Sequence, residues 1–120
     1  MKTENREQIE FIQWFKRNCP GELIIHIPNG GSRNIVEATT LKAMGVVAGV
    51  PDLFIPGRRL WIEMKRAKGG RVSAEQKTLI ASIQEFGYTV KVCKGCEEAV
   101  AVILSQPKIQ NITVTSQLIP

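Results

Sequence analysis

Apolar and polar residues alternate most regularly in the hexapeptide LWIEMK, at residues 60–65. One parity is entirely apolar, and the other carries Trp61, Glu63 and Lys65. Because successive side chains of a strand point to opposite faces, the pattern predicts a strand with one face for the core and one polar face. The charged residues of that polar face either meet solvent, as in many half-exposed strands, or serve a reaction.

The same kind of pattern predicts the remaining elements. Spacing of apolar residues typical of amphipathic helices occurs in four segments, at residues 3–17, 36–44, 73–86 and 97–104. Short runs rich in apolar residues predict three further strands, at residues 23–27, 52–55 and 88–94. The resulting order, α-β-α-β-β-α-β-α, predicts one α/β domain with a mixed central sheet flanked by helices.

The turn PGRR joins residues 52–55 to residues 60–65 and predicts a β-hairpin. If the turn centres on its second and third residues, the numbers of paired residues sum to 115, so Asp52 faces Glu63. Two carboxylates opposed in this way have Cβ atoms about 4.5–5.5 Å apart and destabilise a sheet unless something compensates. A hard divalent cation with oxygen ligands would do so, and Lys65 would point toward the same place.

Length and charge narrow the class of protein. The chain has 120 residues, the length of one domain. Its 16 Lys and Arg residues against 11 Asp and Glu give a net charge of +5, which favours a polyanionic partner without proving one. No apolar run is long enough to span a bilayer, and no apolar signal segment follows Met1. We therefore expect an intracellular protein.

The cysteine content argues against a disulfide framework, because the number of cysteines is three. Cys93 and Cys96 could form a zinc site together with Cys19 and His26. We favour the simpler interpretation, in which Cys93 is a small buried thiol within a strand and His26 is a structural histidine.

Several motifs together resemble a known nuclease family. Pro51-Asp52, followed by Glu63-Met64-Lys65, resembles the PD-(D/E)xK nuclease signature. The surrounding PNGG, GVPDL, SAEQ and FGYTVKVCKG are similar to the virus-type replication-repair nuclease (VRR-NUC) domain. The resemblance implies a restriction-endonuclease-like fold and a nuclease domain at residues 1–104. The tail at residues 105–120 would then be an extra strand or an arm that contacts a partner.

The resemblance also implies roles for the central residues. Asp52 and Glu63, with the backbone carbonyl of Met64, would bind Mg²⁺ or Mn²⁺, and Lys65 would orient or activate the attacking water. Gln76 has two interpretations. It fits a capping box that begins at Ser73, and by resemblance it is an active-site glutamine; we favour the second, although one side chain could serve both.

The first helix is expected to add an acid to the site. Glu4 shares the apolar stripe of Phe11 and Phe15 and is predicted to face inward. Glu7 and Glu10 are predicted to lie off this stripe, in solvent. We therefore choose Glu4 as the additional catalytic residue.

DNA contacts are predicted outside this centre. Asn29 and Gly30, in the PNGG loop, would line the DNA path or form a simple turn. Lys68 and Arg71 would contact phosphates without reading sequence. Trp61 would stack on a base or, as we favour, pack on the sheet.

The sequence thus predicts a Mg²⁺-dependent, structure-selective DNA endonuclease that acts on branched DNA such as Holliday junctions or flaps, in the form of a homodimer. The alternative is a noncatalytic nucleic-acid-binding module with a nuclease-like fold. Sequence-specific restriction would need a recognition element for which 120 residues leave little room. Metal-dependent cleavage separates the first two possibilities.

Overall fold

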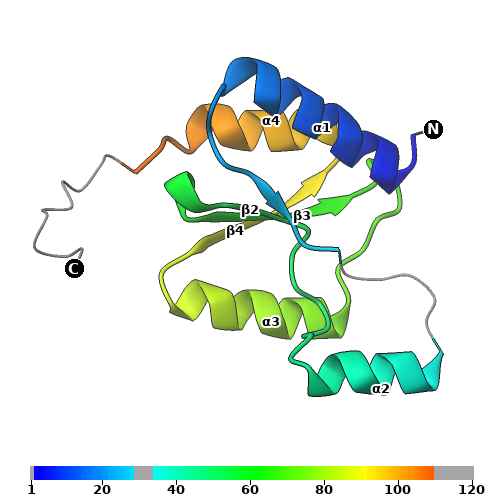
Figure 1. Cartoon of the computed structure of the whole chain (residues 1–120). Helices are drawn as coiled ribbons and strands as arrows, with labels where there is room; N and C mark the ends of the chain where they lie inside the picture. Colours follow the sequence, from blue (N-terminus) through cyan, green and yellow to red (C-terminus); the bar gives the residue numbers. More distant parts are fainter. Residues whose placement is uncertain (1, 29–33, 110–120) are drawn as a thin grey trace, which may run out of the picture.

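A sheet between two layers of helices forms the body of the protein (Figure 1). The computed structural model describes residues 2–28 and 34–109. The elements, in chain order, are α1 (Glu4–Asn18), β1 (Ile25–His26), α2 (Ile35–Ala43), β2 (Leu53–Ile55), the 3-10 turn η1 (Pro56–Arg58), β3 (Leu60–Lys65), α3 (Ala74–Glu85), β4 (Thr89–Lys94) and α4 (Cys96–Ser105). Helices α1 and α4 lie side by side on one face of the sheet and α3 covers the other, which confirms the predicted α/β class.

The sheet has the strand order β1-β2-β3-β4 and is mixed. The first three strands are antiparallel, whereas β4 runs parallel to β3, and α3 makes the crossover between them. In the hairpin, Leu53 pairs with Ile62 and Ile55 with Leu60, so the paired numbers sum to 115 (53 + 62 and 55 + 60) as predicted. The turn itself is a short 3-10 helix followed by Arg59 in the left-handed region, at a φ of 48°.

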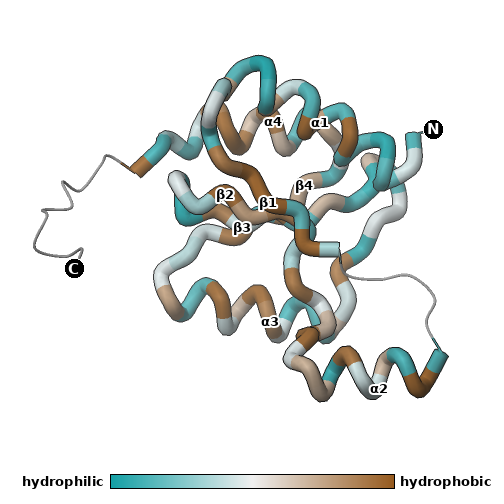
Figure 2. The backbone as a smooth tube through the Cα atoms, viewed as in Figure 1, coloured by the Kyte–Doolittle hydropathy of each residue, from teal (hydrophilic) through white to brown (hydrophobic). Residues whose placement is uncertain are grey.

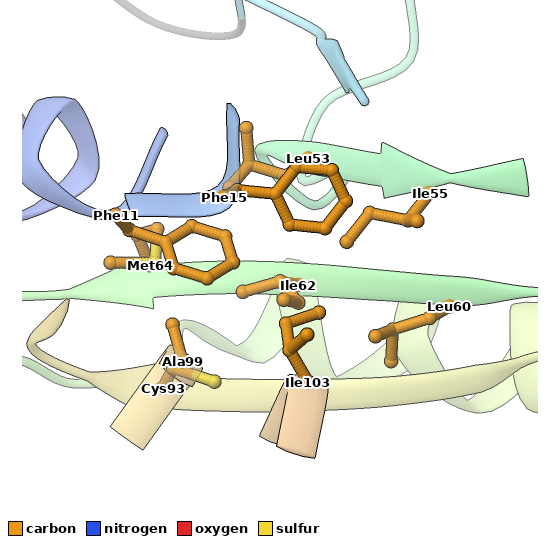
Figure 3. Packing of buried hydrophobic residues seen from close by; sticks show 10 residues of the cluster. All are labelled: Phe11, Phe15, Leu53, Ile55, Leu60, Ile62, Met64, Cys93, Ala99 and Ile103. Atoms are coloured by element: carbon orange, nitrogen blue, oxygen red, sulfur yellow. The ribbon is translucent and has the colours of Figure 1, made fainter. Parts of the chain in front are cut away.

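The core lies between the sheet and the α1–α4 layer (Figure 3). The apolar parity of β3 points toward this layer, and all three of its side chains are fully buried. The cluster comprises Phe11, Phe15, Leu53, Ile55, Leu60, Ile62, Met64, Cys93, Ala99 and Ile103. Burying an aliphatic or aromatic side chain of this kind contributes about 1.5–3 kcal/mol. Figure 2 shows the corresponding band of hydrophobic residues through the central strands. The polar parity of β3 is thereby directed to the opposite face.

A buried ion pair ties the hairpin turn to the helices. Arg58, 8% exposed, donates hydrogen bonds from Nε and Nη2 to the two carboxylate oxygens of Glu22, both at 2.9 Å. Its Nη1 donates to the carbonyl oxygens of Ile103, at 3.1 Å, and Gln106, at 2.6 Å. The single guanidinium therefore holds the turn against the end of α4 and the segment that follows α1.

The predicted element bounds hold to within a few residues. Strand β1 is shorter than the predicted residues 23–27, and α4 continues through Ser105, one residue past the predicted domain boundary. The division into residues 1–104 and 105–120 stays a prediction. Asn29, Gly30 and most of the tail, predicted to be an extra strand or an arm that contacts a partner, lie outside the described residues. No helix in the described part of the chain is long and apolar enough to cross a membrane.

Candidate active site

The hairpin brings two carboxylates together. Asp52 directly precedes β2 behind the fully buried Pro51, and Glu63 lies on the polar parity of β3. The Met64 backbone N–H donates a hydrogen bond to Asp52 Oδ2 at 2.7 Å, which fixes the Asp52 side chain beside β3. Glu63 is 3% exposed, and its Oε1 is buried without a hydrogen-bond partner. A buried acceptor left unpaired is costly, and it therefore marks the position where a ligand would be stabilising.

Lys65 neutralises part of this charge. Its Nζ lies 3.2 Å from Glu63 Oε2, and its side chain is only 12% exposed. Burial, and next the charge of Asp52, nevertheless raise the pKa of Glu63 to about 7, although Lys65 acts in the opposite direction. The ammonium group alone is therefore insufficient to compensate for two neighbouring carboxylates in a desolvated place.

Gln76 forms the predicted capping box and also contacts Glu63, while its role as an active-site residue stays a prediction. Its Oε1 accepts from the backbone N–H of Ser73 at 2.9 Å, while its own N–H donates to Ser73 Oγ at 3.1 Å, which completes a capping box at the start of α3. Its Nε2 donates to Glu63 Oε2 at 2.6 Å. The side-chain amide of Gln76 therefore links the start of α3 to Glu63, with Oε1 in the capping box and Nε2 at the carboxylate.

A cavity of about 360 Å³ connects these residues with the first helix and the loop before α3. Its lining includes six side chains that the sequence predicts for the site: Glu4, Asp52, Glu63, Lys65, Arg71 and Gln76. Burial first, and then the charge of Asp52, raise the pKa of Glu4. The structure thus places Glu4 and Arg71 at the same site as the central residues, and their catalytic and DNA-binding roles stay predictions.

Three lining residues, Gly49, Val50 and Glu75, were not singled out from the sequence. Glu75 borders the cavity from the first turn of α3, one residue before Gln76. Gly49 borders it at a φ of +84°, where a Cβ atom would lie 3.3 Å from the backbone nitrogen of Gln76. The GVPDL motif contains the signal for Gly49, because only glycine combines this backbone conformation with such a close approach.

The prediction for Glu7 is wrong. Glu7 is 7% exposed, and its Oε1 accepts a hydrogen bond from the Cys96 backbone N–H at 3.1 Å, so it caps α4. Spacing contained the signal, because Glu7 lies four residues before Phe11 on the inward stripe. Glu10 is only partly in solvent, and it forms an ion pair with Lys2 at 2.9 Å.

Three residues discussed from the sequence, His26, Trp61 and Lys68, do not line this cavity. His26 Nδ1 lies 2.9 Å from the carbonyl oxygen of Asp52, which also accepts from the Ile27 N–H at 2.8 Å, so His26 has a structural contact. Trp61 stacks on Phe54 with ring centroids 4.4 Å apart, in agreement with the packing interpretation. Lys68 does not border this cavity; it lines a neighbouring one.

The donor set suits a hard cation. Within residues 2–28 and 34–109, no group of three or more His, Cys, Asp or Glu side chains is placed to hold a metal ion. Mg²⁺, however, is usually bound by one or two carboxylates and keeps several waters. The opposed Asp52 and Glu63, the unpaired Glu63 Oε1 and the adjacent Met64 backbone meet that requirement. The possible zinc ligands Cys19, His26, Cys93 and Cys96 likewise form no group of three or more within these same residues.

Comparison with known proteins points in the same direction. The family model of the VRR-NUC domain matches residues 1–97. Among solved structures, the chain is similar to a VRR_NUC domain protein, with 31% sequence identity, a TM-score of 0.76 and coverage of 88% of each chain. No curated protein matches the chain significantly. The resemblance inferred from the motifs is confirmed.

Proposed function

Because this chain belongs to the VRR-NUC domain family, a nuclease-type family, we propose that it is a Mg²⁺- or Mn²⁺-dependent DNA endonuclease that hydrolyses phosphodiester bonds. The observation that carries the proposal is the convergence of Asp52, Glu63 and Lys65, with one buried carboxylate oxygen left unpaired. Most buried polar side-chain atoms of folded proteins have a hydrogen-bond partner, so this oxygen calls for an explanation.

Each residue of the proposed centre has a separate role in phosphodiester hydrolysis. Asp52, Glu63 and the Met64 carbonyl would hold the cation. A bound Mg²⁺ or Mn²⁺ would polarise the scissile phosphate and neutralise its charge. Lys65 Nζ would orient the attacking water and stabilise negative charge on the phosphate, as a donor held in position before the reaction.

The remaining residues keep this centre in place. Gln76 holds Glu63 Oε2, and the Met64 N–H holds Asp52 Oδ2. Glu4 and Arg71 border the same cavity. Arg71 would contact a phosphate of the DNA, which positions the backbone without reading its sequence.

The proposed substrate is branched DNA, such as a Holliday junction or a flap, which would place the protein in DNA repair or replication. Neither the described elements nor the cavities form a separate module for reading bases, so shape is the property left for recognition. The described part of the chain has a single Asp52–Glu63 carboxylate pair of this kind, and resolving a junction would take two cuts. A homodimer would supply them.

The test is cleavage of labelled four-way junction, flap, splayed and linear duplex DNA with Mg²⁺, Mn²⁺ or EDTA. We expect metal-dependent cutting of the branched substrates, reduced roughly 100-fold or more in Asp52→Ala and Lys65→Ala. Lys42→Ala, an exposed lysine of α2 outside the cavity, is the matched control and should cleave like the parent. Binding without cleavage under every metal condition would instead favour the noncatalytic module.

A further inference from the structure

A second and larger cavity lies on the helical side of the molecule. Its volume is about 790 Å³, and it is bordered by α1, by the start of the loop after β3 and by the junction of β4 with α4. We refer to it as the α1–α4 groove. Its cationic lining residues are Lys2, Arg6, Arg17, Lys68 and Lys94. None of them belongs to the catalytic cavity.

Most of the negative charge in the groove is already engaged. Of its three carboxylates, Glu7 accepts the Cys96 N–H, and Glu10 pairs with Lys2 at 2.9 Å and with Arg6 at 3.8 Å. Glu97 is the third. By contrast, the three other cations form no ion pair within the described part of the chain: Arg17, Lys68 and Lys94. Glu97 also forms no ion pair within these residues, so three unpaired cations against one unpaired carboxylate leave a positive balance in the groove.

An aromatic side chain completes the lining. Trp14 borders the groove, is half-buried, and stacks on Phe11 with an interplanar angle of 17°. A positively charged groove with an aromatic platform is the arrangement that binds single-stranded nucleic acid, because phosphates meet the cations and bases stack on the ring. The volume is in the range of pockets for small ligands, roughly 300–1,000 Å³, which is the scale of a nucleotide rather than of a duplex.

The groove connects with the catalytic cavity through a third cavity. That cavity shares Glu4, Lys65 and Arg71 with the catalytic one and shares Lys2 with the groove. Arg66 adds a further cation between the two. Basic residues therefore border all three neighbouring cavities, from Lys65 at the proposed centre to the groove that Trp14 lines.

We propose that the α1–α4 groove binds a single-stranded segment of DNA next to the cleavage position, such as a flap or an unpaired arm of a junction. Trp14 stacks on a base, while Arg17, Lys68 and Lys94 contact phosphates. The identification of this strand as part of the substrate rests on the proposed nuclease function. Binding of single-stranded DNA in the groove does not.

The first test measures binding of a labelled oligothymidine by fluorescence anisotropy, in EDTA, between about 50 and 200 mM salt. The variant is Arg17→Ala/Lys94→Ala. Its matched control is Lys16→Ala/Lys91→Ala, which removes two exposed lysines of the same elements that do not border the groove. We expect the groove variant to lose affinity and its slope of log K against log salt to fall by about 1.4, since each phosphate contact on a single strand contributes about 0.7.

The second test follows Trp14 directly. The chain has two tryptophans, so in a Trp61→Phe background all indole fluorescence comes from Trp14. We expect oligothymidine to quench this emission with the same midpoint as the anisotropy titration. Duplex DNA of the same length should quench it less.

The outcomes separate the groove from the nuclease. Equal losses of affinity in the groove variant and its control, binding without quenching, or no binding of oligothymidine would each overturn the groove proposal. None of these results depends on cleavage. Conversely, groove-dependent binding together with no metal-dependent cleavage of any substrate would support the groove and refute the nuclease.

Discussion

Glu63 is the residue whose surroundings are least explained by stability alone. It is almost fully buried, faces a second carboxylate across the hairpin, and has one oxygen that accepts no hydrogen bond from the described part of the chain. Burial and Asp52 together raise its pKa to about 7. Residues with strongly shifted pKa values concentrate at functional sites. Replacing them would often increase stability, but it would remove the group that the function requires.

The first prediction concerns Glu63→Gln in the absence of metal. The folded protein keeps the Glu63 proton up to about pH 7, whereas the unfolded chain releases it near the ordinary value of 4.5. Folding therefore takes up a proton between these values, and the parent loses stability as the pH rises from about 4.5 to 7. A glutamine cannot ionise. We expect Glu63→Gln to unfold at higher urea concentration than the parent at pH 8 and to match it near pH 4.5.

A suitable control is Glu97→Gln, because Glu97 is exposed and does not border the cavity that contains Glu63. This change should give no comparable gain at alkaline pH. If Glu63→Gln were less stable than the parent at pH 8, the raised pKa would be wrong. The ion pair with Lys65 would then outweigh the destabilisation of the Glu63 carboxylate by burial and by Asp52.

Gln76 allows its two roles to be separated by substitution. Ser73→Ala removes only the capping hydroxyl and should lower stability by about 1 kcal/mol while leaving cleavage near the parental rate. Gln76→Ala removes the other half of the capping box and also the 2.6 Å contact to Glu63. We expect it to lower stability by a similar amount and cleavage by roughly 10- to 100-fold, the usual effect of losing a partner that orients a ligand.

Urea unfolding and cleavage of a labelled junction measure the two effects. Cleavage near the parental rate in both Ser73→Ala and Gln76→Ala would mean that Gln76 acts only as a cap. A large loss in both would mean that the position of α3, rather than the amide itself, controls the site.

At the scale of elements, the hairpin could be predicted from the sequence because two local rules agree there. The alternation in LWIEMK fixed which side chains share a face, and the length of PGRR fixed the register, so Asp52 and Glu63 could be placed together. Glu7 could not be interpreted in the same way. Its position on the inward stripe was visible, but the N–H that compensates its burial belongs to Cys96, 89 residues later in the chain.

The turn of the hairpin also depends on a partner from another part of the chain, because Glu22 lies 36 residues before Arg58. Arg58→Met would leave Glu22, whose side chain is 4% exposed, without its main cation. Removal of one partner of a buried pair costs about 3–5 kcal/mol, so we expect a correspondingly lower free energy of unfolding in urea. Arg59→Met, on the adjacent exposed arginine, is the control and should cost much less.

The double variant Arg58→Met/Glu22→Met refines this test. It removes the uncompensated carboxylate, so it should recover part of the stability lost in Arg58→Met. Recovery will be incomplete, because the carbonyl groups of Ile103 and Gln106 remain without their donor. A double variant less stable than Arg58→Met would show that the guanidinium acts mainly through these carbonyls.

At the scale of the whole molecule, the sequence predicted the layers and several residues that meet at one cavity, but not the α1–α4 groove. Arg17, Lys68 and Lys94 are far apart in the chain and come from three different segments. Lys68 was assigned to the surroundings of the catalytic residues because it is close to them in sequence. The fold instead places it toward α1, since the chain turns away from the sheet directly after β3.

The last prediction follows from the single Asp52–Glu63 carboxylate pair in the described part of the chain and from a substrate that would take two cuts to resolve. In a homodimer, mixing the parent with an excess of Asp52→Ala would produce dimers with one active centre, and these should nick a four-way junction on one strand. We therefore expect nicked junctions to replace paired cuts as the ratio of variant to parent rises, and sedimentation equilibrium at micromolar concentration should show a dimer. Asp52→Ala should not unfold the protein, because it only removes an acceptor from the Met64 N–H. If the protein sediments as a monomer, and the ratio of nicks to paired cuts does not change on mixing, each chain cuts alone.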